Sequence, residues 1–252
     1  MKDRSSKIFG LIFFLFLCGG ILYLLFAGPD SNKENKYEKI EITNNKLLTE
    51  NEYLKYLELY DTTIFKELTL ADIKVNLERH PYIIRAEVSH DGINKIEAEL
   101  TEKIPKALII TDNEFKLVTE KGELLPLLNK NIVNGLPIIS NIKRNSKELL
   151  DENELEAAFK IINAVQLIDE NMYESLAEIN LRNGGDILIM FAGFRFPIVF
   201  GKNSETRKIL ALKNIWSNLI NEKGSNYDIE YIDLRYKNKI FIGKRKPTET
   251  TG

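Results

Sequence analysis

Apolar residues follow three different patterns along this chain of 252 residues. The first is an uninterrupted apolar run over residues 8–27, behind a short tail that carries Lys2, Arg4 and Lys7. About 20 residues at about 1.5 Å each form a helix about 30 Å long, which matches the hydrocarbon core of a bilayer. The run is apolar all round rather than along one stripe, so a buried core helix does not explain it. This pattern predicts a transmembrane helix.

Two other fates of this segment leave weaker signals in the sequence. A cleaved signal peptide needs small residues before the cut, where this chain has Leu25 and Phe26. A lipid-modified Cys18 would also follow small residues, and Phe16 and Leu17 stand there instead. We therefore expect a retained anchor.

The flanking charges alone do not decide the orientation of the anchor. Lys33, Lys36 and Lys39 follow the apolar run about as closely as three basic residues precede it. Long folded domains cross membranes largely regardless of charge, so a short basic tail before a large domain favours a cytoplasmic tail. We expect residues 1–7 in the cytoplasm and the bulk of the chain outside it.

The second pattern, over residues 37–105, predicts a strand, two helices and a hairpin of strands. Ile40 and Ile42 alternate with polar residues, which is typical of a half-buried strand over residues 37–43. Each helix begins at a threonine with an acidic residue three positions later, the arrangement of a capping box. The two pairs are Thr49 with Glu52 and Thr69 with Asp72.

The second of these helices should end at His80-Pro81, because the residue before a proline avoids helical geometry. Two alternating strands follow, joined by a turn at Asp91-Gly92. Two helices can cover only one face of a small three-stranded sheet. The residues expected to face them are Ile84, Ala86 and Val88 in one strand and Ile96, Ala98 and Leu100 in the next.

The third pattern mixes short strands with two longer helices over residues 106–242. The helices are expected at residues 151–169, with Leu155, Phe159, Ile162 and Val165 inward, and at 206–221, with Ile209, Leu212, Trp216 and Leu219 inward. Strands are expected at residues 106–111, 115–119, 123–125, 176–181, 187–191, 195–200, 230–236 and 239–242. The predicted fold class is α+β, with a mixed β-sheet domain and two covering helices as its second part.

The sequence offers no constellation of residues for catalysis, a cofactor or a metal. Cys18 is the only cysteine and lies in the apolar run, so disulfides play no part. His80 precedes a proline and His90 lies beside a turn, so surface or capping roles explain them better than metal ligation. A net charge of −2 does not attract nucleic acid. We expect a non-enzymatic protein that binds other proteins rather than a small-molecule substrate.

The last two predicted strands are the best candidate for protein binding. A chain that ends in a hairpin often leaves its last strand at the edge of a sheet. Such an edge carries unpaired backbone N–H and C=O groups and can accept a strand from another protein. Solvent or the basic tail after residue 242 would cover the edge equally well, and the sequence leaves both alternatives open.

Four short segments, in their order behind a single N-terminal span, resemble the FtsQ/DivIB family of bacterial cell-division proteins. The similarity covers nearly the whole chain. The segments are Ile64-Phe65, His80-Pro81-Tyr82-Ile83, Glu102-Lys103-Ile104-Pro105-Lys106-Ala107 and Tyr231-Ile232-Asp233-Leu234-Arg235-Tyr236.

The resemblance implies a single-pass scaffold at the division septum of the cytoplasmic membrane, which links assembly of the division ring to septal wall synthesis. It also implies a polypeptide-transport-associated (POTRA) domain followed by a β domain. The implied parts are a cytoplasmic tail at residues 1–7, a transmembrane helix at 8–27, a linker at 28–36, the POTRA domain at 37–105, the β domain at 106–242 and a disordered tail at 243–252.

The resemblance further implies the partners. In this family the end of the β domain binds the small coiled-coil proteins FtsB/DivIC and FtsL, partly by strand addition to the last strand. The partner-binding residues carried over by match are Arg235 and Tyr236 from the hairpin and Lys239, Ile240, Phe241 and Ile242 along the edge.

Two other classes of protein remain open. A POTRA-like module also suits a component of a protein secretion or outer-membrane assembly system. A membrane-anchored extracytoplasmic enzyme is the other class, and it would need a deep pocket with several titratable groups.

Overall fold

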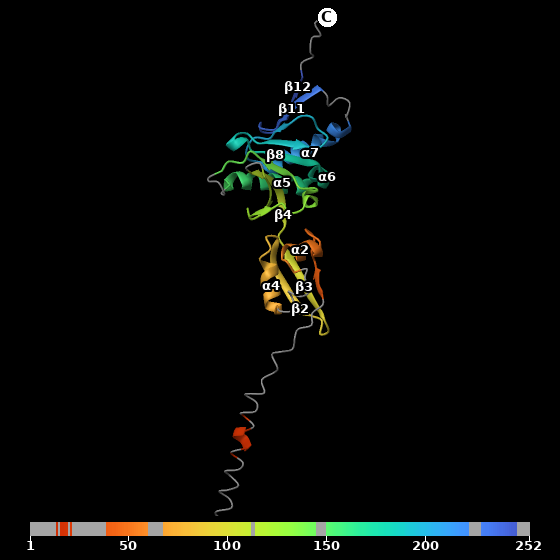
Figure 1. Cartoon of the computed structure of the whole chain (residues 1–252). Helices are drawn as coiled ribbons and strands as arrows, with labels where there is room; N and C mark the ends of the chain where they lie inside the picture. Colours follow the sequence, from red (N-terminus) through yellow and green to blue (C-terminus); the bar gives the residue numbers. More distant parts are fainter. Residues whose placement is uncertain are drawn as a thin grey trace, which may run out of the picture.

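The computed structural model describes residues 14, 16–19, 21, 39–59, 68–111, 114–144, 150–221 and 228–245. The predicted tail at 1–7, most of the predicted span at 8–27 and the predicted linker at 28–36 lie outside these ranges. Among the described residues, no helix is both long enough and apolar enough to cross a membrane. The remaining described residues contain a smaller and a larger β-sheet, each with its own helices. The two sheets follow one another along the long axis of Figure 1.

The smaller sheet has three strands in the order β1-β3-β2, with β1 parallel and β2 antiparallel to β3. Thr49 and Thr69 begin the helices α2 and α4, and both expected capping boxes form, which confirms these helix starts. The buried faces of the strands and helices contribute to one apolar cluster. The elements are β1 (Lys39–Thr43), α2 (Glu50–Tyr56), α4 (Leu70–Glu78), β2 (Ile83–His90) and β3 (Lys95–Glu102).

The prediction that Ile84 faces the core is wrong. A bulge interrupts the pairing of β2 with β3 between Ile83 and Arg85. An extra residue in one strand shifts the alternation of its side chains. As a result Ile83 is buried, whereas Ile84 is 59% exposed. The alternation resumes at Ala86, which is buried as expected.

The larger sheet has nine strands in the order β12-β11-β10-β9-β8-β7-β4-β5-β6 and mixes parallel with antiparallel pairs. Its strands are β4 (Pro105–Thr111), β5 (Glu114–Thr119), β6 (Leu124–Pro126), β7 (Ile138–Ser140), β8 (Leu176–Asn180), β9 (Leu188–Phe191), β10 (Ile198–Val199), β11 (Ile229–Asp233) and β12 (Phe241–Lys244). This large mixed sheet confirms the predicted α+β class.

Two long helices, α5 (Glu152–Ile168) and α7 (Glu205–Asn221), pack against each other and contribute to the core of the larger sheet. All eight residues expected to face inward from them are buried. The sequence patterns missed four short elements, namely the strand β7, the helix α6 (Glu170–Ser175) and the 3-10 helices η1 (Lys130–Val133) and η2 (Arg182–Gly184).

The two sheets share one apolar core where they meet. Leu108, Leu117 and Leu125 of the larger sheet belong to the same buried cluster as the residues of the smaller one. The buried Tyr82 adds two hydrogen bonds across the junction. Its hydroxyl donates to the carbonyl of Pro126 at 2.6 Å and accepts from the backbone N–H of Leu128 at 3.0 Å. These contacts hold the two sheets together as one packed unit.

The side chain of His80 is buried, with 1% of its surface exposed, so of the two expected roles, surface or capping, the surface role is wrong for this residue. Its Nδ1 accepts a hydrogen bond from the backbone N–H of Tyr82 at 3.1 Å. The rings of Tyr53 and Tyr56 lie edge-on to the imidazole at 4.7 and 4.5 Å between centroids. Burial lowers the pKa of His80 to about 4, because the cluster solvates the charged imidazole poorly.

This burial predicts a loss of stability in acid. Between pH 6.5 and 4 the unfolded chain binds a proton at His80 that the folded chain does not, so the free energy of unfolding falls as the pH falls. The full effect is at most about 3 kcal/mol and is reached below pH 4. Chemical denaturation of the full chain in detergent at pH 7, 5.5 and 4 measures it. The variant His80→Asn should lose less stability than the wild type, and parallel curves would contradict the prediction.

Candidate protein-binding site

The expected edge strand exists and lies at the far end of the larger sheet. β12 has β11 as its only neighbour in the sheet order. In Figure 1 both strands lie at the end of the molecule away from the smaller sheet. The last strand was predicted at residues 239–242, but β12 runs from Phe241 to Lys244. The expected disorder from residue 243 is therefore wrong for Gly243 and Lys244, and residues 246–252 lie outside the described ranges.

The sequence predicts a turn at Lys237-Asn238 between the last strands, and this turn forms, but it does not join the two strands directly. A loop over residues 234–240 joins β11 to β12, so Lys239 and Ile240 precede the strand rather than form it. The hydrogen bonding to β10 nevertheless continues one residue past the end of β11. The backbone N–H of Leu234 donates to the carbonyl of Val199 at 2.9 Å, and Leu234 is buried.

The backbone hydrogen bonds of β11 show which backbone groups of β12 point away from the sheet. The N–H of Ile232 donates to the carbonyl of Pro197 at 3.1 Å, so Ile232 faces β10 rather than β12. Its antiparallel partner is Ile242. Because bonded and non-bonded pairs alternate, Phe241 and Gly243 bond to β11, and Ile242 directs its N–H and C=O away from the sheet. Among the described residues, no side chain accepts a hydrogen bond from β12.

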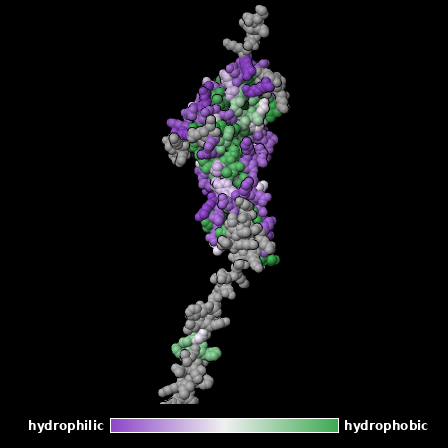
Figure 2. All heavy atoms as spheres, in the orientation of Figure 1, coloured by the Kyte–Doolittle hydropathy of each residue, from purple (hydrophilic) through white to green (hydrophobic). Residues whose placement is uncertain are grey.

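Exposed apolar side chains surround this open edge. Tyr236 and Phe241 are 55% and 46% exposed, and their rings meet edge to face at 4.9 Å between centroids. Ile242 is 45% exposed. Figure 2 shows apolar and hydrophilic residues side by side at this end of the molecule. The structure therefore brings Tyr236 and Phe241 together, whereas the side chain of Ile242 points to the other face of β12.

Arg235 is held in place by two carboxylates. Its guanidinium donates to Asp233 Oδ1 at 3.0 Å and to Asp233 Oδ2 at 2.6 Å, and it donates to Asp186 at 2.8 Å. The hydrogen bonds from Arg235 hold the pKa of the Asp233 carboxyl below its usual range. Gly201 gives the aliphatic part of Arg235 its room, since a Cβ there would lie 2.7 Å from Arg235 Cγ. Part of the guanidinium stays exposed at the surface.

A basic groove of about 350 Å³ lies between α7 and the loop 234–240. Lys208 anchors its wall, because its ammonium donates to the carbonyls of Phe200 at 2.7 Å and Lys202 at 2.9 Å. Burial lowers the pKa of Lys208. Within the described lining no residue is acidic, and six are basic, namely Lys202, Arg207, Lys208, Arg235, Lys237 and Lys239.

On each of the other three sheet edges, a side chain occupies one backbone group. On β1, the carboxylate of Glu50 accepts from the backbone N–H of Ile42 at 3.2 Å. On β2, Glu78 accepts from the N–H of Ala86 at 3.1 Å. On β6, Pro126 lacks an N–H, and its carbonyl is occupied by a tyrosine hydroxyl. Such devices prevent unwanted strand pairing.

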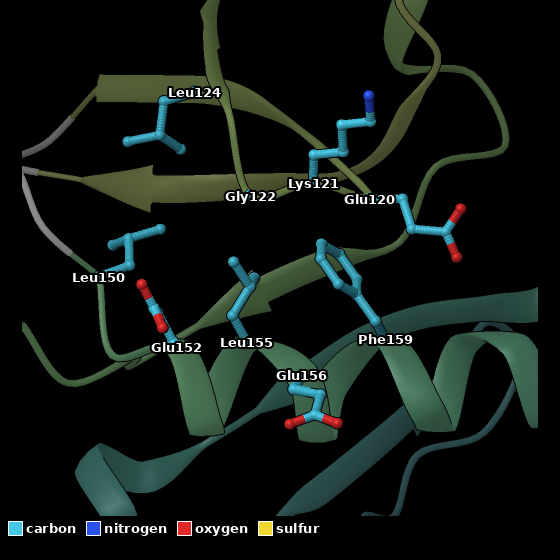
Figure 3. A pocket seen from close by; sticks show the side chains of 9 residues that line it. All are labelled: Glu120, Lys121, Gly122, Leu124, Leu150, Glu152, Leu155, Glu156 and Phe159. Atoms are coloured by element: carbon cyan, nitrogen blue, oxygen red, sulfur yellow. The ribbon is translucent and has the colours of Figure 1, made fainter.

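A second groove, of about 580 Å³, lies between α5 and the turn from β5 to β6 (Figure 3). Its centre is apolar, with Leu124, Leu155 and Phe159 pointing into the gap in Figure 3. Lys160 binds the carboxylate of Glu156 at 2.8 Å. Because its polar groups do not converge on one point, this groove does not favour the enzyme alternative. In the described parts of the chain, no group of three or more His, Cys, Asp or Glu side chains could hold a metal.

Sequence reasoning missed the tertiary partners of the site. Asp186 and Gly201 are distant in sequence from Arg235, and no local pattern links them to it. The pairing of Tyr231 with Gly243 across the last two strands was also missed. A glycine in an edge strand opposite an aromatic residue is a signal that could have found this pair.

The comparisons with known proteins fit the order of the two sheets. A family model for the POTRA domain of FtsQ type matches residues 35–103. The βααββ unit therefore makes the chain a POTRA-domain protein. A second model, for the C-terminal part of the cell division proteins FtsQ/DivIB, matches residues 107–235. The chain belongs to the FtsQ/DivIB family of cell division proteins. Of the segments that carried the resemblance, Ile64-Phe65 lies outside the described residues.

Three curated relatives bear names of this family. Cell division protein FtsQ of Syntrophotalea carbinolica is 25% identical over 82% of this chain and 73% of its own length. Cell division protein FtsQ of Geotalea daltonii is 22% identical over 96% of this chain and 87% of its own length. Cell division protein DivIB of Clostridium tetani is 24% identical over 68% of this chain and 65% of its own length.

The geometry of the site predicts the effect of a side chain at Gly243. A Cβ there would clash with Cε1 of Tyr231, so the ring or the strand must move. Overpacking of this kind costs about 1–3 kcal/mol. We expect Gly243→Ala to lower the free energy of unfolding by that amount, and by much less in a Tyr231→Ala background. Equal losses in both backgrounds, measured by chemical denaturation, would show that the ring contact is irrelevant.

Proposed function

We propose that this cell division protein is a non-catalytic, membrane-anchored scaffold that binds FtsB/DivIC-like and FtsL-like partners through the open edge of β12. The observation that carries the proposal is the contrast between β12 and the other three edges. β12 offers the outward N–H and C=O of Ile242, whereas a side chain occupies one backbone group on each of the edges β1, β2 and β6. A partner strand added to β12 would form main-chain hydrogen bonds worth about 1 kcal/mol each.

Side chains around the edge would supply specificity. Tyr236 and Phe241 form an exposed aromatic pair, and aromatic residues are enriched among the residues that dominate binding energy. The basic groove beside the edge favours a partner with acidic residues next to its added strand. The exposed part of the Arg235 side chain can contact a partner while its ion pairs with Asp186 and Asp233 keep the side chain in position. In this proposal Lys239 and Ile240 act from the loop rather than from the strand.

The proposed anchor is the apolar run at residues 8–27, with the tail at 1–7 in the cytoplasm and the rest of the chain outside the cytoplasmic membrane. The proposed domains are the POTRA domain at 37–105 and the β domain at 106–242, after a linker at 28–36. A linker of about ten residues reaches at most about 35 Å, so the POTRA domain would lie near the bilayer. The edge of β12 would then face partners at the far end of the molecule (Figure 1). Such a scaffold would link assembly of the division ring to septal wall synthesis.

Capture of the partners by the full-length membrane protein tests the proposal. Ile242→Pro removes the outward N–H but spares the ladder to β11, since Ile242 does not bond to that strand. We expect it to reduce co-purification of the DivIC-like and FtsL-like proteins at least tenfold.

The matched control is Ile242→Ala, which shortens the side chain and keeps the backbone donor. It should retain more of the partners than Ile242→Pro. Undiminished recovery with a folded Ile242→Pro protein would refute strand addition at this edge. Equal losses with both variants would assign the binding to the side chain instead.

A further inference from the structure

The longest strands of the smaller sheet include one of its edges. β2 has eight residues and lies at the edge opposite β1. A long edge strand is a ready template for pairing with another chain. The backbone N–H of Asp91 donates to the carbonyl of Lys95 at 3.0 Å, which directs the odd-numbered residues of β2 towards β3. The even-numbered residues Ala86 and Val88 therefore direct their backbone groups outward.

One carboxylate blocks the middle of this edge. Glu78, the last residue of α4, accepts the outward N–H of Ala86 at 3.1 Å. An acidic residue is electrostatically unfavourable at the C-terminal end of a helix, and the last turn of α4 contains no basic residue. Lys74, four residues earlier in α4, lies 3.9 Å from the carboxylate of Glu78. The hydrogen bond to the strand edge thus gives Glu78 a role beyond its own helix.

The blocked edge is complementary to itself. If two copies of β2 paired antiparallel about Ala86, the outward groups of Ala86 would bond to those of its counterpart. Arg85 of each copy would then stand opposite Glu87 of the other, twice by symmetry. Both side chains are exposed on the outer face, where they now pair with each other within one chain. Opposite charges directly across two strands stabilise the pair.

We propose that Glu78 is an edge guard, which prevents the POTRA sheet from pairing through β2 with a second copy of this chain. The symmetric edge makes a second copy the best-fitting partner. The carboxylate denies that partner the central N–H of Ala86. This role of Glu78 is independent of the proposed binding at β12.

Removal of the guard tests the inference. We expect Glu78→Ala to convert the full chain in detergent from monomer to dimer in sedimentation equilibrium. The conservative control Glu78→Gln keeps a carbonyl oxygen that can accept the N–H of Ala86, and it should stay as monomeric as the wild type. Both variants are made in the Ile242→Pro background, so that pairing through β12 does not contribute. A folded Glu78→Ala protein that stays monomeric would overturn the proposal.

Charge reversal identifies the interface. In the Glu78→Ala protein, Arg85→Glu places like charges opposite each other and should abolish the dimer. The double change Arg85→Glu with Glu87→Arg should restore it. A dimer that ignores Arg85→Glu would assign the contact to another surface and refute pairing about Ala86.

Hydrogen exchange covers the case in which Glu78→Ala does not fold. In the folded wild type the amide of Ala86 should exchange more slowly than that of Val88, whose N–H also points outward. If the amide of Ala86 exchanges as fast as that of Val88, Glu78 does not hold this amide. That result would overturn the proposed role of Glu78.

Discussion

The backbone groups at the edge of a β-sheet must find partners, and this constraint organises the whole molecule. The two sheets have four edges, and on three of them a side chain occupies one backbone group. Glu50 occupies the N–H of Ile42 on β1, Glu78 occupies that of Ala86 on β2, and the hydroxyl of Tyr82 occupies the carbonyl of Pro126 on β6. The fourth edge, β12, directs the backbone of Ile242 outward. A chain that occupies backbone groups on most of its edges limits where another strand can add, which gives binding by backbone hydrogen bonds a defined place.

The packed junction between the two sheets fixes the larger sheet, and with it the edge of β12, relative to the smaller sheet. The hydroxyl of Tyr82 both occupies a backbone group on β6 and joins the sheets, because it bonds to the chain on either side of Leu127. Three leucines of the larger sheet complete the same core. A scaffold with this junction would hold its binding edge at a fixed distance from its POTRA domain. His80, buried beside Tyr82, makes the junction sensitive to acid.

Local patterns predicted the helices well and the strand details less well. The capping boxes at Thr49 and Thr69 give both helix starts, since the signal lies within four residues. Ile84 was misplaced because a bulge, which no alternation reveals, shifts the phase of β2. The edge position of the last strand was predicted correctly, but its limits were not. After β11 the chain forms a longer loop, in which Leu234 bonds to Val199 and Arg235 bonds to Asp186, and only the folded chain brings these residues together.

The exchange rate of a single amide tests the central claim most directly. In the free protein the amides of Phe241 and Gly243 should be protected by β11, whereas the amide of Ile242 should exchange freely. Addition of the extracytoplasmic part of the DivIC-like partner should slow exchange at Ile242 and leave its two neighbours nearly unchanged. An Ile242 amide that exchanges at the same rate in the complex as in the free protein would contradict strand addition at β12.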